Sequence, residues 1–247
     1  MMAAEEYYIY TGGVVPRHVT RVRIDKSITV IPARAFQGHP NITELDCHDK
    51  VEKVEESAFY LCRSLRRVIM PGVKVVDQWA FWKCEALTIV ECGKLERIRG
   101  CAFSSCISLR NINLPSIKIV EGSAFCWCKA LMTVKFGDKL KTLNGRALYG
   151  CRALERIAIP LKDGMITHDN IITGCEKMKH VDLVEEELHE TIAALLLEEW
   201  KKDMRRKIDA LNQILDSSHY TCRKGRGCGG EGRCDTNLDH KCSTQYH

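Results

Sequence analysis

The chain has 247 residues, 28% charged and 45% hydrophobic, which is ordinary for a folded soluble domain. The formal charge of +5 is mild and argues against a dedicated nucleic-acid-binding protein, which would carry a concentrated basic face. The first six residues contain no basic start and no apolar core, and no apolar run in the chain is long enough to span a membrane. We therefore expect no signal peptide, no transmembrane segment and a cytoplasmic location, with the 14 cysteines reduced.

Residues 1–18 are expected to form a lead-in or cap. Tyr7 to Tyr10 have the composition of a strand, and Gly12-Gly13 is a turn signal. If a repeat structure follows, its first unit exposes a core that needs a cover. A short hairpin is the predicted cover.

One five-residue segment recurs along the chain and organises the rest. It has the pattern Ala-Phe-x-x-Cys, and full copies begin at Ala58, Ala80, Ala102 and Ala124. Including weaker copies, the Phe slot recurs every 22 to 24 residues from Phe36 to Ile172. Self-similarity at this period predicts a solenoid in which each repeat forms one coil.

Each repeat also contains two sets of apolar slots. The first reads Leu-x-x-Val/Ile-x-apolar and is often followed by proline, as in Leu65, Val68, Met70 and Pro71. This alternation predicts a strand with one buried face, which the proline ends. A second apolar pair follows, Val73 and Val76 in that copy. The Ala-Phe segment is then expected to form a short helical or 3₁₀ turn.

These motifs resemble the BspA-type (treponema-type) leucine-rich repeat over residues 19–184. The resemblance implies an α/β solenoid, coiled in the right-handed sense, of about seven units. A parallel β-sheet would form one face and short helical or 3₁₀ turns the other. It also implies a binding protein, without indicating one ligand. His39 in the Cys slot, and Leu148 and Ile172 in the Phe slot, depart from the pattern in terminal repeats, where divergence is expected.

Residues 185–216 have a different pattern. Apolar residues recur at spacings of three and four, at Ile192, Leu195, Leu196, Trp200, Met204, Ile208, Leu211 and Leu215. We predict an amphipathic helix of ~25 residues and ~37 Å, similar to extensions that follow this repeat type in families from single-celled eukaryotes. Two alternatives remain open: the helix caps the last coil, or its 188–215 stretch pairs with another copy to form a homo-oligomer.

Residues 217–247 are polar and glycine-rich and are predicted to form a disordered tail. Its cysteines, Cys222, Cys228, Cys234 and Cys242, lack the close pairs that structural zinc sites favour. We therefore predict no metal site and no cofactor. A metal- or redox-responsive tail remains an alternative hypothesis.

Six cysteines occupy the repeat slot: Cys62, Cys84, Cys106, Cys128, Cys151 and Cys175. Stacked coils would place them in a line rather than around one point, which does not suit metal binding. We expect each to serve as a small buried apolar residue with a weak hydrogen-bond donor.

The outward positions of the predicted strands are the candidate binding surface, because side chains alternate between the two faces of a strand. The outward columns also contain Ile89 and Thr133. Their mixed charge and few apolar members suit a protein partner, although an ordinary solvated face has the same composition. The candidate site residues are Arg21, Arg23, Glu44, Asp46, Arg67, Ile69, Glu91, Asn111, Asn113, Lys135, Arg156 and His180.

Catalysis has little support in the sequence. No G-x-S-x-G, P-loop, dinucleotide-binding or H-E-x-x-H motif occurs, and the nine histidines are scattered. On the opposite edge of the coils, Tyr60 and Trp82 would be neighbours and form a weaker candidate contact site. We therefore predict a non-catalytic scaffold that binds a protein partner.

Overall fold

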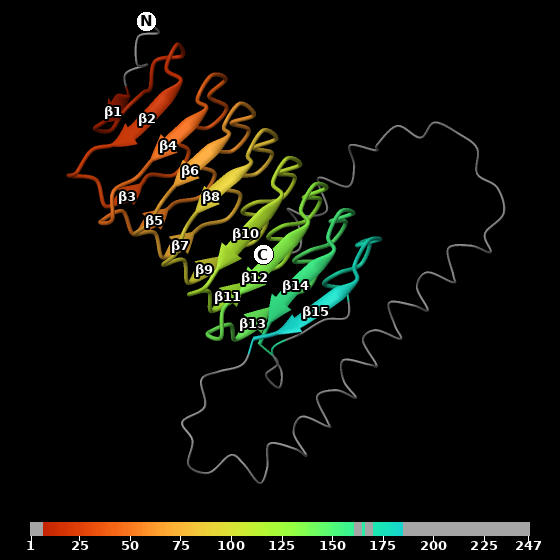
Figure 1. The fold of residues 1–247 in the computed structure, drawn as a ribbon. Coiled ribbons are helices and arrows are strands. Elements are labelled where there is room, and N and C mark those ends of the chain that lie inside the picture. Colours follow the sequence, from red (N-terminus) through yellow and green to blue (C-terminus); the bar gives the residue numbers. More distant parts are fainter. Residues whose placement is uncertain (1–6, 161–164, 166–169, 185–247) are drawn as a thin grey trace, which may run out of the picture. The chain divides into compact units, whose positions relative to one another are not determined.

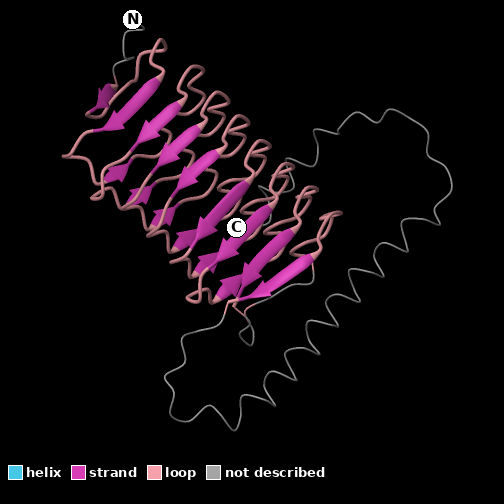
Figure 2. Cartoon of the chain, in the orientation of Figure 1, coloured by secondary structure: helices cyan, strands magenta, loops and turns pink. Residues whose placement is uncertain are grey.

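The fold is that of a computed structural model, which describes residues 7–160, 165 and 170–184. Within these ranges the chain forms strands and turns and no helix, so none that could cross a membrane (Figure 2). The predicted helix over 185–216 and the tail over 217–247 lie outside the described residues. The same holds for pairing through 188–215 and for the tail cysteines.

The longer strands form one side of a coil stack, which we call the strand face (Figure 1). Apart from β1, they occupy the predicted Leu-x-x-Val slots. Where they pair, they run parallel and place each residue beside its counterpart one repeat away, as Glu44 lies beside Arg67. Their bounds are β1 (Tyr8–Tyr10), β2 (Arg21–Ile24), β4 (Glu44–Asp46), β6 (Arg67–Ile69), β8 (Ile89–Glu91), β10 (Asn111–Leu114), β12 (Thr133–Phe136), β14 (Arg156–Ile159) and β15 (His180–Leu183).

The second residue of each later apolar pair, together with the residue before it, forms a further parallel sheet, which we call the back sheet. It is continuous over six short strands. The sequence predicted the buried residue of each pair but no sheet here. The strands are β3 (Val30–Ile31), β5 (Lys53–Val54), β7 (Val75–Val76), β9 (Arg97–Ile98), β11 (Ile119–Val120) and β13 (Thr142–Leu143).

The strand face is not the single sheet that was predicted. It divides into a five-stranded sheet, β1-β2-β4-β6-β8, and a four-stranded sheet, β10-β12-β14-β15. Among the described strands, β8 and β10 are therefore successive but unpaired. We call this step the seam.

The predicted helical or 3₁₀ turns are wrong. The Ala-Phe segments are turns whose amides donate alternately within the turn and to the next coil. Phe81 N–H donates to Ala102 C=O at 2.8 Å, whereas Cys84 N–H donates to Phe81 C=O at 3.2 Å. Trp79 and Lys83 bound this turn with positive φ of 54° each. Alternate amides donate to the next coil and not within the turn, and a residue with positive φ stands at each end of it. A continuous series of helical hydrogen bonds therefore cannot form.

The predicted N-terminal hairpin is also wrong. β1 lies parallel to β2, with Tyr8 beside Val22 and Tyr10 beside Ile24, so the lead-in contributes one strand of an additional coil. The Tyr10 ring is buried, with its centroid 4.7 Å from that of Phe36. This ring covers the first repeat as the hairpin was expected to do.

The core is a column of buried aromatic rings at the Phe slots. Successive centroids from Phe36 through Phe59, Phe81, Phe103 and Phe125 are 4.7, 5.1, 5.1 and 5.4 Å apart. The rings lie within 7° of parallel. The shape of the repeat imposes this arrangement, because each coil presents the same residue at the same height. Leu148 continues the column and is fully buried.

Candidate partner-binding face

The strand face carries all twelve candidate residues at its outward positions. In β10, for example, Asn111 and Asn113 are exposed and alternate with buried Ile112 and Leu114. The predicted columns are therefore real arrangements of neighbouring side chains. The interactions that these side chains make, however, differ from one part of the face to another.

The N-terminal part of the strand face neutralises its own charges. Arg21 lies 3.0 Å from Glu44, and Arg23 lies 3.0 Å from Asp46. Both guanidinium groups also sit over the Tyr7 ring, at 4.1 and 4.2 Å from its centroid. The role of Tyr7 was not foreseen, because nothing in its local sequence connects it with residues one repeat ahead.

Two further candidate cations are paired. Arg67 Nη2 lies 3.4 Å from Glu91 Oε1, and Arg156 Nε lies 3.4 Å from Asp182 Oδ2. Exposed Lys135 makes no ion pair with any residue in the described ranges. These exposed pairs set the local charge pattern and contribute little stability.

At the centre of the strand face, two apolar and two amide side chains lie around the Arg67–Glu91 pair. We define the central patch as Ile69, Ile89, Asn111 and Asn113. Ile89 is 46% exposed and lies between Arg67 and Asn111 in its column. The sequence placed Ile89 in that column, but the candidate set omitted it. Apolar and amide side chains mixed with a few charged ones have the composition typical of a protein interface.

At the seam, a repeated pair of hydrogen bonds is missing. At the other described steps from β2 to β15, two successive amides donate to one carbonyl of the preceding coil. Met132 and Thr133, for example, both donate to Arg110 C=O, at 2.7 and 3.3 Å. No corresponding bonds join the amides of Arg110 and Asn111 to Thr88 C=O in the described chain.

The burial of inward side chains also changes at the seam. Val90 occupies the inward slot of β8 but is only half-buried, whereas Val68, Ile112 and Val134 in the equivalent slots are buried. The seam therefore opens part of an inward apolar side chain to solvent. The repeat pattern predicted Val90 to be buried like its counterparts.

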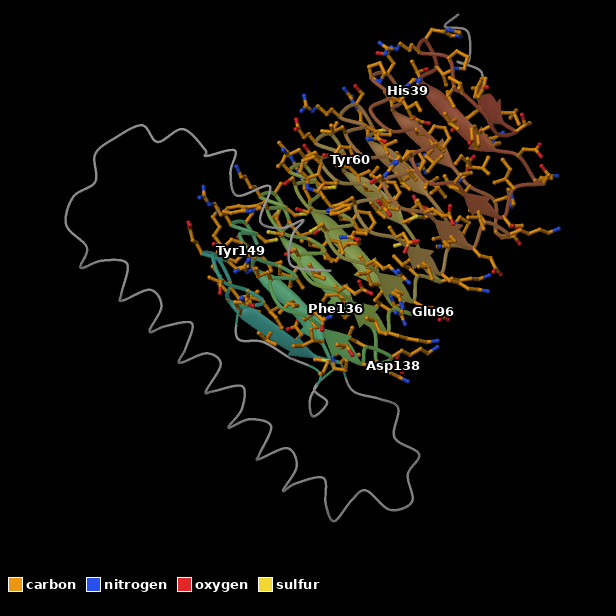
Figure 3. The ribbon with its side chains drawn as sticks, turned by 180° about the vertical axis from the view of Figure 1, so that it is seen from behind. His39, Tyr60, Glu96, Phe136, Asp138 and Tyr149 are labelled. Atoms are coloured by element: carbon orange, nitrogen blue, oxygen red, sulfur yellow. The ribbon has the colours of Figure 1, made fainter. Side chains whose placement is uncertain are left out.

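The back sheet satisfies its charges internally. Asp77, whose side chain is 12% exposed, lies 2.9 Å from both Lys53 and Arg99, the second contact lacking hydrogen-bond geometry. Glu96 accepts a hydrogen bond from Lys118 at 2.8 Å, and this bond is the main cause of its lowered pKa. Figure 3 shows Glu96 on the edge of the stack opposite Tyr60 and Tyr149.

The six slot cysteines are buried, as predicted. Each thiol donates to the Phe-slot carbonyl of the preceding coil, for example Cys106 Sγ to Phe81 O at 3.2 Å and Cys128 Sγ to Phe103 O at 3.1 Å. Burial raises the pKa of Cys62 to about 12, so its thiol stays protonated near neutral pH. The described His, Cys, Asp and Glu residues form no group that could hold a metal ion.

His39 occupies the first Cys slot and, like the slot cysteines, bonds to a backbone carbonyl of the preceding coil. Its buried ring lies with Nε2 3.0 Å from Pro16 O, and Nδ1 3.4 Å from Asn41 N. Because the Asn41 amide must donate to Nδ1, the proton is on Nε2, which donates to Pro16 C=O. Burial lowers the pKa of His39 and favours this neutral form.

The aromatic edge is a packing feature. The Tyr60 and Trp82 rings stack 4.6 Å apart, and Lys83 Nζ lies 4.1 Å from the Trp82 centroid. Since the stacked tyrosine occupies one face of the indole, the ammonium occupies the other. Trp127 lies against Gly150, where an added Cβ would approach the indole to 2.6 Å. This edge therefore provides no open indole face at Trp82.

Two comparisons place this architecture among known proteins. A crystal structure of a T. pallidum leucine-rich repeat protein shares 29% identity over 55% of this chain and 67% of that chain, with a TM-score of 0.53. A leucine-rich repeat protein from Eubacterium ventriosum shares 19% identity and has the same fold, with a TM-score of 0.56 over 72% of this chain. This chain spans 47% of that protein.

No curated protein matches the sequence. The sequence model of the family described as the BspA type leucine rich repeat region does match, in 6 copies, over residues 17–131 and 96–222. These matches include every described strand from β2 onward, and β1 lies before them. The chain belongs to the BspA-type leucine-rich-repeat family.

Proposed function

We propose that this chain is a non-catalytic binding module that docks a protein partner on its strand face, with the central patch as the principal contact. One observation carries the proposal: exposed Ile89 lies beside the Arg67–Glu91 pair and, with Ile69 and two asparagines, interrupts the series of ion pairs on one outward face. Family membership supports protein interaction in general and does not identify the partner.

The arrangement favours a partner with an apolar contact residue and a polar surround. Burial of an isoleucine side chain on binding lowers the free energy of the complex, whereas removing an ion pair such as Arg21–Glu44 from water raises it. We therefore assign Ile69, Ile89, Asn111 and Asn113 to the contact centre. The Arg67–Glu91 pair lies among these four residues, and the other paired residues, with Lys135 and His180, form the rim and contribute to orientation.

The chemistry of the described residues supports a binding role over catalysis. The slot thiols are buried, and burial holds the pKa of Cys62 at about 12. His39 is buried and engaged on both ring nitrogens. These groups hold coils together and are not positioned to receive a substrate.

The test compares two matched substitutions in the full chain. Ile89→Arg adds a charge to the central patch, and Val30→Arg adds one at a position 37% exposed on the back sheet. Proteins captured from lysate are quantified by mass spectrometry. The proposal predicts partners retained by wild type and Val30→Arg and reduced at least tenfold by Ile89→Arg. Equal recovery with all three chains would contradict it.

A further inference from the structure

Exposed positive charge collects where each turn leads from its Cys slot into the following strand. Two basic residues of these segments are neutralised, since Arg63 lies 3.5 Å from Glu85 and Arg152 lies 3.8 Å from Glu176. Five others are exposed and make no ion pair with any residue that the structure describes, and Glu155 is the one further acidic residue of the described segments. We call these five the basic edge: Arg66, Arg110, Lys129, Lys177 and Lys179.

Exposed apolar side chains lie among these cations. Ile107 is 40% exposed and Met132 is 42% exposed. Met132 N–H donates to Arg110 C=O at 2.7 Å, so these two residues lie one coil apart, and Ile107 holds the slot of Lys129 in the preceding coil. Ion pairs at that slot in other coils show that its side chains reach the adjacent coil. Two apolar and two basic side chains therefore alternate across one step.

The basic edge is extended and straight. Coils repeat at the strand spacing of ~4.8 Å, so the row from Arg66 to Lys179, about five coils apart, extends over ~24 Å. Figure 3 shows the turns, marked by Tyr60 and Tyr149, on the side of the stack opposite Glu96. A straight row of cations on an outer edge can contact a flat anionic surface at several points at once.

The apolar side chains narrow the class of anionic partner. The phosphates of a nucleic acid offer Ile107 and Met132 no apolar surroundings, whereas a bilayer has hydrocarbon directly beneath its anionic headgroups. Trp127 is 38% exposed and lies two residues before Lys129, and indoles are enriched at the headgroup level of membranes. Surfaces that lie on membranes combine these same residue types.

We propose that the basic edge is a membrane-contact surface. Its Lys and Arg side chains bind the headgroups of anionic phospholipids, while Ile107 and Met132 enter the boundary with the acyl chains. A few cations and two apolar side chains give reversible binding rather than permanent anchoring. This surface is separate from the strand face, and the inference does not depend on the proposed function.

The charge contribution is tested by co-sedimentation of the full chain with phosphatidylcholine vesicles, with or without about 30% phosphatidylserine, in ~0.1 M salt. We expect binding to the anionic vesicles to be at least tenfold tighter than to the neutral ones. Arg110→Gln with Lys129→Gln should weaken it about 25-fold, because each basic residue near an anionic surface contributes a factor of about five.

The matched control removes the same charge from the opposite edge. Lys94→Gln with Lys139→Gln changes two exposed lysines that make no ion pair with any described residue. Because screening limits attraction to about 10 Å, this pair should weaken binding less than about threefold. Equal weakening by the two pairs of substitutions, or no binding of wild type to the anionic vesicles, would overturn the inference.

The apolar contribution is tested by Ile107→Ser with Met132→Ser, which should weaken vesicle binding at least tenfold through lost burial. Ile89→Ser on the strand face is the control, with unchanged binding expected. No effect of the Ile107 and Met132 substitutions would overturn the inference. Single-stranded DNA bound more tightly than the vesicles would assign the basic edge to nucleic acid and overturn it as well.

Two variants separate this inference from the proposed function. Ile89→Arg should lose lysate partners and still bind anionic vesicles, whereas Arg110→Gln with Lys129→Gln should retain the partners and lose the vesicles. If vesicle binding fails and partners still depend on Ile89, only this inference fails. If partners ignore Ile89→Arg and vesicle binding follows the basic edge, only the proposed function fails.

Discussion

The Ala-Phe-x-x-Cys turns and the strand face are built from the same repeats but differ in continuity. Along the turns, ring stacking and the thiol–carbonyl bond recur from coil to coil, with Phe81 and Phe103 5.1 Å apart and Cys106 bonded to Phe81 O at 3.2 Å. Along the strand face, Ile69, Ile89 and two asparagines interrupt the series of ion pairs, and the ladder stops at the seam. The turns make the same contacts between successive coils, whereas the residues and contacts of the strand face change from coil to coil.

That difference separates two kinds of position in a repeat. Inward slots and turn slots must meet identical neighbours in the coils above and below, so their residue types recur. Outward slots meet solvent, which accepts Arg, Ile or Asn in turn. Deviations on the outward side, such as Ile89 between Arg67 and Asn111, are therefore where recognition can reside.

The largest expected effect is on the ring column. Phe103→Ala removes a fully buried ring between Phe81 and Phe125 and should reduce the free energy of unfolding by ~3–5 kcal/mol, through lost burial and a cavity. Denaturant titration provides the measurement. Ile89→Ala on the strand face is the control, with an expected loss below ~1 kcal/mol. A loss below ~1 kcal/mol for Phe103→Ala would place this ring outside the core.

An intermediate effect is expected on the back sheet. Asp77→Asn removes a charge that lies 2.9 Å from both Lys53 and Arg99 and should cost about 1–2 kcal/mol. Glu91→Gln is the matched substitution on the strand face, where the 3.4 Å pair with Arg67 is exposed and contributes below about 0.5 kcal/mol. Chemical denaturation of both variants measures the difference. Equal losses would contradict the contrast between the two sheets.

A smaller effect should appear with pH at the first Cys slot. Burial lowers the pKa of His39 below the ordinary histidine value of about 6.5. As pH falls through that value, the unfolded chain takes up a proton that the folded chain resists. The contribution of His39 to the free energy of unfolding is therefore fully present above this pH. Below it the contribution decreases, by at most about 1.4 kcal/mol per pH unit.

The His39 prediction is checked by denaturation of wild type and His39→Gln between pH 7.5 and 5. His39→Gln should weaken the pH dependence of the free energy of unfolding. An unchanged slope in His39→Gln would assign the dependence to other groups.

The smallest effect is expected on the slot thiols under native conditions. Their burial and the raised pKa of groups such as Cys62 predict no measurable alkylation by iodoacetamide in the folded chain at neutral pH. Peptide mapping by mass spectrometry reports each site separately. Labelling should appear for Cys62, Cys84, Cys106 and Cys128 together on unfolding. Rapid modification of one of them in the native chain would contradict its assigned place in the core.

The period of the repeat was sufficient to place the strands of the strand face, the ring column and the slot cysteines, but not the back sheet. Each is decided by burial, and burial follows directly from residue type at a fixed spacing. The same argument gave the outward columns and placed Arg21 beside Glu44, one repeat apart, but their ion pair was not predicted. It was insufficient for the turns, because their amides bond to another coil, which no local pattern encodes.

The seam could not be predicted from the sequence. The repeats beginning at Leu87 and Leu109 have the same length and the same apolar slots as the repeat beginning at Leu65. Whether two strands pair depends on how the whole coils lie against each other, which is a property of the assembled stack. Lys135 and His180 were correctly placed on the face, and their contribution to binding remains a prediction.

Amide hydrogen exchange of the intact chain is the most direct test of the contrast between a continuous column and an interrupted face. Peptides and single amides are compared at the step between the repeats of Leu87 and Leu109. We predict strong protection of the Phe81 and Lys83 amides, which donate across coils, together with rapid exchange at Arg110 and Asn111. Protection at Arg110 and Asn111 equal to that at Met132 and Thr133 would contradict the account.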